Sequence, residues 1–175
     1  MSTTRRRGSS NVKSKESEQR YFIDTSSLVN LQRWRPATTN PKTCRHLAGL
    51  IDSDRLIAPR AVLGELGDRD DVLLKWARRH KAMFKRHTAE IVRRVTTIVK
   101  RFPDLVDINA TQDAADPFVV ALADEESTLI EKIIVVTDEK FAPGRTRIPH
   151  VCQAFGLRYL TVHQLFLFEG WPWDE

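Results

Sequence analysis

The chain has 175 residues, 41% of them hydrophobic, and 28 Lys and Arg against 23 Asp and Glu give a formal net charge of +5. A chain of this length can fold as one domain without disulfides or metal, and two cysteines are too few for a disulfide framework. No apolar run approaches the ~18 residues of a membrane span, and the basic N-terminus lacks the apolar region of a secretory signal. We therefore expect a cytoplasmic protein with no membrane segment.

The charge is distributed unevenly along the chain. Residues 1–20 carry six basic and two acidic residues and few apolar ones, which predicts a disordered basic arm. Residues 75–101 carry ten Lys and Arg and only one acidic residue, Glu90. The remainder carries 12 basic and 20 acidic residues. An acidic body is therefore crossed by one strongly basic stretch.

The first third of the chain begins with an apolar run at residues 21–23 that ends at Asp24 and is typical of a buried parallel strand. Ser26 or Ser27 then predicts the cap of a helix that runs to Trp34. A second helix is expected at residues 41–51. A weaker strand pattern follows at residues 55–58.

The middle third is helical in pattern and basic in charge. A short helix is expected at residues 60–66, because Pro59 precedes it and Gly67 follows it. Residues 70–86 and 88–100 then alternate apolar and basic residues at helical spacing. We treat residues 70–101 as a basic helical insert.

The last third alternates strands and helices. A weak strand is expected at residues 105–108, and Asp116 followed by Pro117 predicts the start of a buried helix. The apolar run at residues 133–137, which leads into Asp138, predicts a second strong strand. Helices at residues 148–155 and 162–168 follow, with a weak strand at residues 158–161 between them.

Strands that alternate with helices predict an α/β fold. We expect a three-layer α/β/α domain over residues 21–170 with a mainly parallel central sheet of four to five strands, and a C-terminal tail at residues 171–175. In such sheets, sites form where the strands end.

Four carboxylates stand beside apolar sequence rather than in solvated runs: Asp24, Glu65, Asp116 and Asp138. If they converge, like charges at short range require a cation. Oxygen ligands suit Mg²⁺ or Mn²⁺, and such a centre suits phosphodiester hydrolysis. Each residue taken singly also fits a structural role, since an Asp at a strand end or before a helix commonly caps backbone N–H groups.

Four short motifs together resemble PIN-domain nucleases, especially the VapC-type toxins of bacterial toxin–antitoxin pairs. They are Tyr21-Phe-Ile-Asp24-Thr-Ser-Ser-Leu28, the segment at residues 57–66 that contains Glu65, Asp116-Pro-Phe-Val-Val-Ala-Leu-Ala123 and Val135-Val-Thr137-Asp138. The segment from Ile148 to Leu165 also resembles a PIN-like subfamily of uncharacterised prokaryotic proteins. The resemblance spans residues 21–168.

This resemblance implies an endoribonuclease dependent on Mg²⁺ or Mn²⁺, with the four carboxylates as metal-site and catalytic residues. Thr25, Ser26 and Thr137 would orient water or the carboxylates, and Asp113 is an additional acidic candidate. It also implies an antitoxin partner and a homodimer.

The basic insert has a physical use in such an enzyme, because an acidic centre repels phosphate and a basic surface attracts it. The predicted RNA-binding residues are Lys75, Arg78, Arg79, Lys85, Arg86, Arg93 and Arg94. The same residues also fit a solvated helix face, or a surface for an acidic antitoxin.

Two other functional classes compete with the nuclease. A catalytically weak PIN-like module that binds RNA or a partner would bind with a steep salt dependence and no metal dependence. A phosphotransfer enzyme is disfavoured, because the common phosphatase pattern has a second Asp two residues after the first and this chain has Ser26 there.

Overall fold

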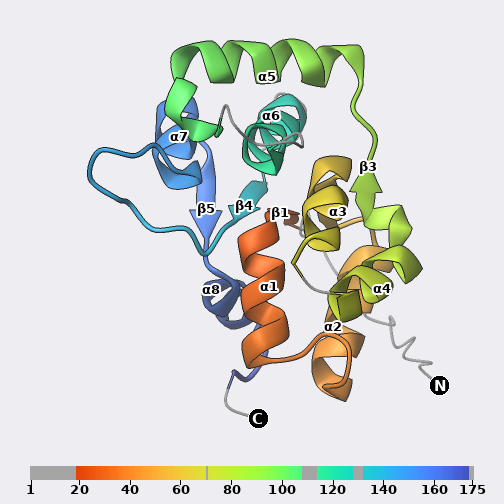
Figure 1. The fold of residues 1–175 in the computed structure, drawn as a ribbon. Helices are drawn as coiled ribbons and strands as arrows, with labels where there is room; N and C mark the ends of the chain where they lie inside the picture. Colours follow the sequence, from red (N-terminus) through yellow and green to blue (C-terminus); the bar gives the residue numbers. More distant parts are fainter. Residues whose placement is uncertain (1–18, 70, 108–113, 128–131, 174–175) are drawn as a thin grey trace, which may run out of the picture.

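A computed structural model of the chain describes residues 19–69, 71–107, 114–127 and 132–173 (Figure 1). Residues 1–18 of the predicted basic arm lie outside the described residues, and Arg20 already belongs to the first strand. No helix within the described ranges is long and apolar enough to cross a membrane.

Five parallel strands form one sheet in the order β3-β2-β1-β4-β5. The strands are β1 (Arg20–Ile23), β2 (Leu56–Pro59), β3 (Phe84–Lys85), β4 (Ile133–Val136) and β5 (Arg158–Leu160). The two strong apolar runs of the sequence are β1 and β4, which pair directly in the centre, with Phe22 opposite Val135. The predicted parallel sheet is confirmed.

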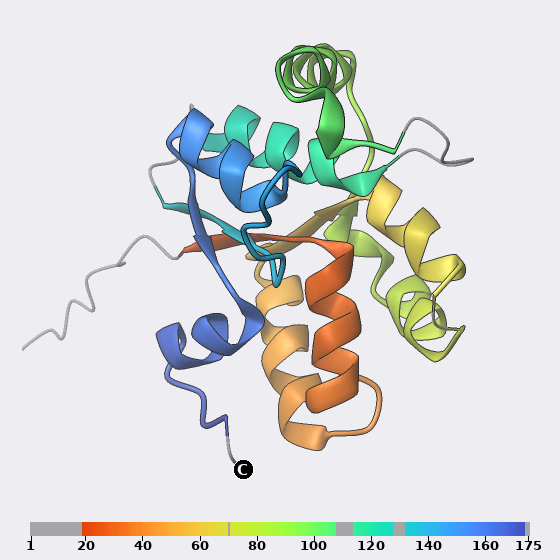
Figure 2. The ribbon, with the colours of Figure 1, turned by 60° about the vertical axis from the view of Figure 1, so that its left-hand side comes forward.

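Within the described residues, eight helices connect and cover the strands. They are α1 (Thr25–Trp34), α2 (Pro41–Asp52), α3 (Arg60–Gly67), α4 (Asp71–Arg79), α5 (Ala89–Arg101), α6 (Ala115–Ser127), α7 (Ile148–Phe155) and α8 (Val162–Phe168), with 3₁₀ turns η1 (Lys81–Met83) and η2 (Pro103–Leu105). Figure 2 shows α1, α2 and α8 on one side of the sheet and α6 and α7 on the other, with α5 outside α6. The predicted three-layer α/β/α architecture is confirmed.

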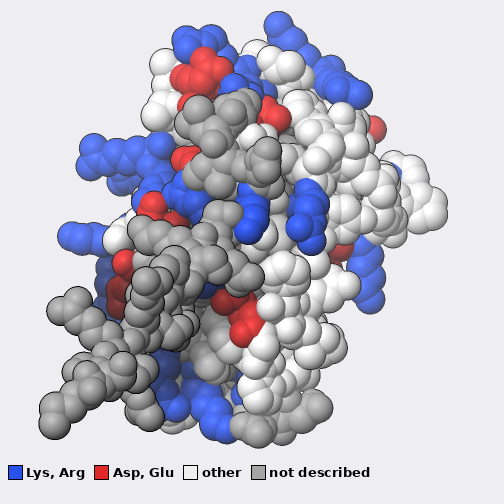
Figure 3. All heavy atoms as spheres, turned by 180° about the vertical axis from the view of Figure 1, so that it is seen from behind, with Lys and Arg blue, Asp and Glu red and all other residues white. Residues whose placement is uncertain are grey.

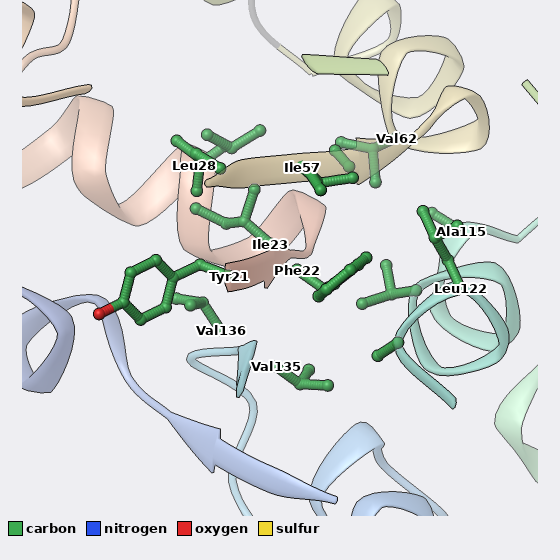
Figure 4. Packing of buried hydrophobic residues seen from close by; sticks show 14 of the residues in the cluster. Tyr21, Phe22, Ile23, Leu28, Ile57, Val62, Ala115, Leu122, Val135 and Val136 are labelled. Carbon is green, nitrogen blue, oxygen red and sulfur yellow. The ribbon is translucent and has the colours of Figure 1, made fainter. Parts of the chain in front are cut away.

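The core lies on both faces of β1. Because successive side chains of a strand point to opposite faces, Phe22 points toward α6 and Ile23 toward Leu28 of α1 (Figure 4). Both Phe22 and Ile23 are fully buried. Burial on two faces explains why β1 reads as a continuous apolar run rather than an alternating one.

The prediction of a strand at residues 105–108 is wrong over its described part. Leu105 ends the 3₁₀ turn η2, which begins with Pro103. The strand that the sequence does not predict is β3, which lies at the edge of the sheet beside β2. Its Phe84 pairs with Ala58 and its Lys85 with Pro59.

The single helix predicted at residues 70–86 is therefore also wrong in its second half. The helix α4 ends at Arg79, and η1 and β3 follow. Phe84 is buried at the edge of the sheet, so pairing with β2 and burial against the core prevail over the helical pattern of the segment.

The chain after α8 packs back on the domain. The ring of Trp171 stacks on His46 of α2 with centroids 4.2 Å apart, and Trp173 meets the ring of Phe166 edge-on. Arg35 donates a hydrogen bond to the Trp173 carbonyl. Residues 171–173 of the predicted tail therefore contact the core, and residues 174–175 lie outside the described residues.

Candidate functional site

The carboxyl ends of the three central strands bring separate segments of the chain together. Asp24 directly follows β1, α3 follows β2, and Thr137, Asp138 and Glu139 follow β4. Because β2, β1 and β4 are adjacent and parallel, these segments meet at one edge of the sheet. The N-terminal end of α6 completes the site, since α6 packs on all three strands.

Asp24 lies deepest in this site, with 1% of its surface exposed. Its Oδ1 accepts a hydrogen bond from the Ser27 N–H at 2.8 Å, so Asp24 caps α1 in place of the predicted Ser26 or Ser27. Its Oδ2 accepts from the hydroxyls of Ser26 and Thr137, each at 2.7 Å. Burial raises the pKa of Asp24 to about 6 although these hydrogen bonds favour its charged form.

Glu65 connects α3 to the neighbouring helices. Its Oε2 accepts a hydrogen bond from the Thr25 hydroxyl at 2.5 Å, and its Oε1 accepts from the backbone N–H of Ala115 at 2.8 Å. Ala115 is the first residue of α6, so the carboxylate satisfies one of the N–H groups that a helix start leaves open. The orientation of Glu65 is thereby fixed from two sides.

Asp116 lies in the first turn of α6, because the helix begins at Ala115, two residues before the Pro117 that the sequence predicts as its first residue. The prediction that Asp116 is the N-cap is therefore wrong, and the side chain is left for the site. No described residue donates a hydrogen bond to its carboxylate. Burial, and then the charges of Glu139, Asp24 and Glu65, raise the pKa of Asp116 to about 8.

Glu139 is the acidic residue that sequence reasoning missed. It is the carboxylate with the strongest electrostatic effect on Asp116. Its Oε1 accepts from Arg147 Nη1 at 2.8 Å, and its Oε2 accepts from the Ile148 N–H at the start of α7 at 2.9 Å. Two adjacent acidic residues after a strand are the signal, but the sequence does not show which of them faces the site.

Asp138 lines the same cleft but is held by other contacts. Its Oδ1 accepts from the Val162 N–H at the start of α8 at 3.0 Å, and its Oδ2 accepts from the Asn30 side chain at 3.2 Å. Both carboxylate oxygens of Asp138 are therefore held by α1 and α8, whereas the charges of Glu139, Asp24 and Glu65 raise the pKa of Asp116.

A cleft of about 940 Å³ opens above these carboxylates. Its described lining includes six acidic residues, among them Glu65, Asp116, Asp138 and Glu139. Four basic residues also line the cleft: Arg69, Lys140, Arg145 and Arg147. The described lining of the cleft therefore carries more acidic than basic residues.

A protein family model described as a domain of unknown function (DUF4411) matches residues 21–172. The chain belongs to this family. No curated protein matches the chain. The DUF4411 match begins in β1 and extends past α8, so it includes every strand and every side chain of the carboxylate site.

Besides the four carboxylates, the residues predicted for the site of this DUF4411 chain are three with side-chain hydroxyls and one further acidic residue. The Thr25 hydroxyl donates to Glu65, and the Ser26 and Thr137 hydroxyls donate to Asp24. These three hydroxyls therefore hold the carboxylates in place. Asp113 lies outside the described residues.

The side-chain oxygens of the site can be compared with those that divalent metal ions prefer. Within the described part of the chain, no group of three or more His, Cys, Asp or Glu side chains is arranged to hold a metal ion. Mg²⁺, however, is bound in proteins by one or two carboxylates with water and substrate phosphate. Asp116 offers oxygens to which no described residue donates, beside Glu139 and Glu65, and this all-oxygen set fits Mg²⁺ or Mn²⁺.

The predicted RNA-binding residues of the DUF4411 chain fall into two groups. Lys85 pairs with Asp54, Arg93 with Glu90, and Arg94 with both Glu90 and Asp124. The side chains of the other four are exposed: Lys75, Arg78, Arg79 and Arg86. In Figure 3, Lys and Arg gather along the top edge, where α5 runs, with Asp and Glu among them. The basic stretch is therefore not a uniform positive face.

Proposed function

We propose that this DUF4411 chain is a Mg²⁺- or Mn²⁺-dependent endoribonuclease with a PIN-like active site. The observation that carries the proposal is the convergence of Asp24, Glu65, Asp116 and Glu139 from four separate segments onto the carboxyl edge of β2, β1 and β4. Three of these four were predicted from sequence motifs. Burying like charges together is unfavourable unless a cation or proton accompanies them.

Asp116, with Glu139 or Glu65 beside it, would hold the metal, which when bound would activate a water and stabilise the leaving oxygen of a phosphodiester. The residues around them act by position. Thr25 and the N–H of Ala115 fix Glu65, and Arg147 and the N–H of Ile148 fix Glu139. Carboxylates held in this way need little reorganisation in the reaction.

The basic residues at the sides of the cleft orient the substrate. Arg69, Lys140 and Arg145 line the cleft, and none of them is in an ion pair with a described residue. They are therefore available for the phosphates on either side of the bond that is cut. Arg147, by contrast, is engaged with Glu139.

The resemblance to VapC-type toxins extends the proposal to the toxin of a toxin–antitoxin pair, acting on RNA in the cytoplasm as a homodimer that an antitoxin blocks. Expression of the wild-type chain alone should then arrest growth, and expression of Asp116→Asn should not. Equal growth with both would remove this part of the proposal and leave the nuclease part to its own test.

The direct test is cleavage of labelled RNA by the purified chain in Mg²⁺, in Mn²⁺ and in EDTA. Asp24→Asn and Asp116→Asn remove one charge each with almost no change in shape, and Asp52→Asn is the matched control because Asp52 is exposed at the far end of α2. We expect metal-dependent cutting by wild type and Asp52→Asn, with 5′-phosphate and 3′-hydroxyl products, and loss in the other two variants.

A PIN-like module that binds RNA or a partner without cutting is the alternative. It is favoured by the hydrogen bonds that already occupy oxygens of Asp24, Glu65 and Glu139. RNA binding by wild type without cleavage in either metal would support this alternative over the nuclease.

A further inference from the structure

The face of α3 that points away from the carboxylate site forms one wall of a groove. Two cavities, of about 310 Å³ and about 360 Å³, share Arg60, Leu63 and Arg78 as lining residues and so adjoin one another. Other lining residues come from α4, η1, β3 and the segment after β3, and α4 and β3 lie beside α3 in Figure 1. We call this the α3–α4 groove.

The charged residues that line the α3–α4 groove are all basic. They are Arg60, Arg78, Lys81 and Arg86, and the described lining contains no acidic residue. All four side chains are exposed, and none forms an ion pair with a described residue. Lys85, Arg93 and Arg94 differ from them, because each is already paired. Three unpaired cations of the basic stretch therefore line this groove together with Arg60, and the described lining has no acidic residue that offsets them.

The groove and the carboxylate site lie on two faces of one short helix. Arg60, Leu63, Gly64 and Gly67 follow the spacing of a single helix face and line the groove. Glu65, five residues after Arg60, points the other way and contacts Thr25 and Ala115. Since an α-helix is ~10 Å in diameter, the groove begins about one helix width from the carboxylates.

We propose that the α3–α4 groove binds the sugar–phosphate backbone of single-stranded RNA outside the cleft, as a second contact for the substrate. This inference rests on the proposed function, which makes RNA the substrate. A groove lined by cations from α3, α4, η1 and the segment after β3 is complementary to a chain with one negative charge per nucleotide.

The cleft itself gives the reason for a second contact. Its described lining holds more acidic than basic residues, so it cannot attract a polyanion at long range. The groove supplies that attraction next to the site. Its floor is apolar, formed by Leu63, Leu74 and Phe84, and suits the ribose and base faces that lie between phosphates.

The test is binding, measured by fluorescence anisotropy, of a labelled uridine oligomer of about 15 nucleotides in EDTA. The groove variant is Arg60→Gln with Arg78→Gln and Arg86→Gln. The control variant removes the same charge from α5, by Arg93→Gln with Lys100→Gln and Arg101→Gln, and all six side chains are exposed. Melting temperatures of both variants verify that they are folded.

We expect the groove variant to lose about tenfold or more in affinity, and the slope of log affinity against log salt to fall by about 2, because each lost phosphate contact removes about 0.7. The control should stay within about threefold of wild type. Equal losses in the two variants would show a diffuse charge effect and overturn the groove. Unchanged RNA binding together with lost binding of a poly-glutamate peptide would assign the groove to an acidic partner and overturn the proposal.

Failure of the proposed function is distinguishable from failure of the groove. Binding in EDTA does not depend on cleavage, so a chain that binds through the groove and never cuts RNA would refute the nuclease alone. If the wild-type chain cuts RNA and the groove variant cuts both long and short substrates equally well, the groove alone is refuted.

Discussion

The two faces of α3 differ in how their charges are held. On one face Glu65 joins a set of carboxylates that are buried and fixed by hydrogen bonds from hydroxyls and helix N–H groups. On the other face Arg60 joins cations that are exposed and unpaired among the described residues. Buried charges at short range perturb each other's pKa, whereas exposed charges of one sign attract an oppositely charged partner from solution. The net charge of +5 therefore conceals two oppositely charged surfaces on the two faces of one helix.

Asp116→Asn is expected to change the function of the carboxylate face of α3 strongly and that of the groove face hardly at all. Asp116→Asn should reduce cleavage of RNA in Mn²⁺ by about a thousandfold, because it removes the carboxylate that would bind metal. The same variant should bind the uridine oligomer in EDTA within about twofold of wild type. Loss of both activities would mean that the faces are not independent.

Asp116→Asn is also expected to change the free energy of unfolding in the absence of metal. The pKa of Asp116 is about 8 in the folded chain and 3.8 ordinarily, so between these values the folded state binds the extra proton and stability falls as pH rises. Each pKa unit corresponds to about 1.4 kcal/mol. Asp116→Asn should therefore raise the free energy of unfolding at pH 9 by a few kcal/mol and much less at pH 4.

This stability prediction is checked by urea unfolding in EDTA at both pH values, with Asp52→Asn as the exposed control. A gain at pH 4 as large as that at pH 9 would show that the substitution acts through packing and not through charge. Asp24, with its pKa raised to about 6, should contribute to the same fall in stability over a lower pH range.

The two adjacent acids after β4 offer a smaller and sharper test. Glu139→Gln should lower cleavage by about 10- to 100-fold, the range found when groups around a metal site are changed. Asp138→Asn should stay within about threefold, because Asp138 contacts α1 and α8 instead. The reverse order would place Asp138 in the metal site, as the sequence motif alone suggests.

The smallest effect is expected on the groove face. Gly67 ends α3, and a Cβ there would meet Leu74 Cδ2 at 3.8 Å, an ordinary contact. Gly67→Ala should raise the free energy of unfolding by about 0.5 kcal/mol, because alanine has less conformational freedom in the unfolded chain. A loss of stability in thermal unfolding would show that the space between α3 and α4 is tighter than the structure has it.

Much of the fold could be predicted because burial on both faces leaves a strong mark on short strands. Residues 21–23 and 133–136 are continuous apolar runs, and both are central strands. The edge strand β3 could not be found, since two residues of pairing leave no pattern that distinguishes Phe84 from a helical apolar position. The error at residues 105–108 has the same cause, because a buried leucine serves a turn as well as a strand.

The residue types that follow the strands can be read from the sequence, which predicts that Asp24, Glu65 and Asp116 meet if the sheet is parallel. What each carboxylate contacts is visible only in the packed chain. Asp24 caps α1, Glu65 takes the N–H that begins α6, and Asp116 is thereby left free of any hydrogen bond from a described residue. The packed chain likewise shows which residues of the basic stretch form ion pairs and which do not. The physical reason is that hydrogen bonds and ion pairs between distant segments depend on distances that only the packed chain defines.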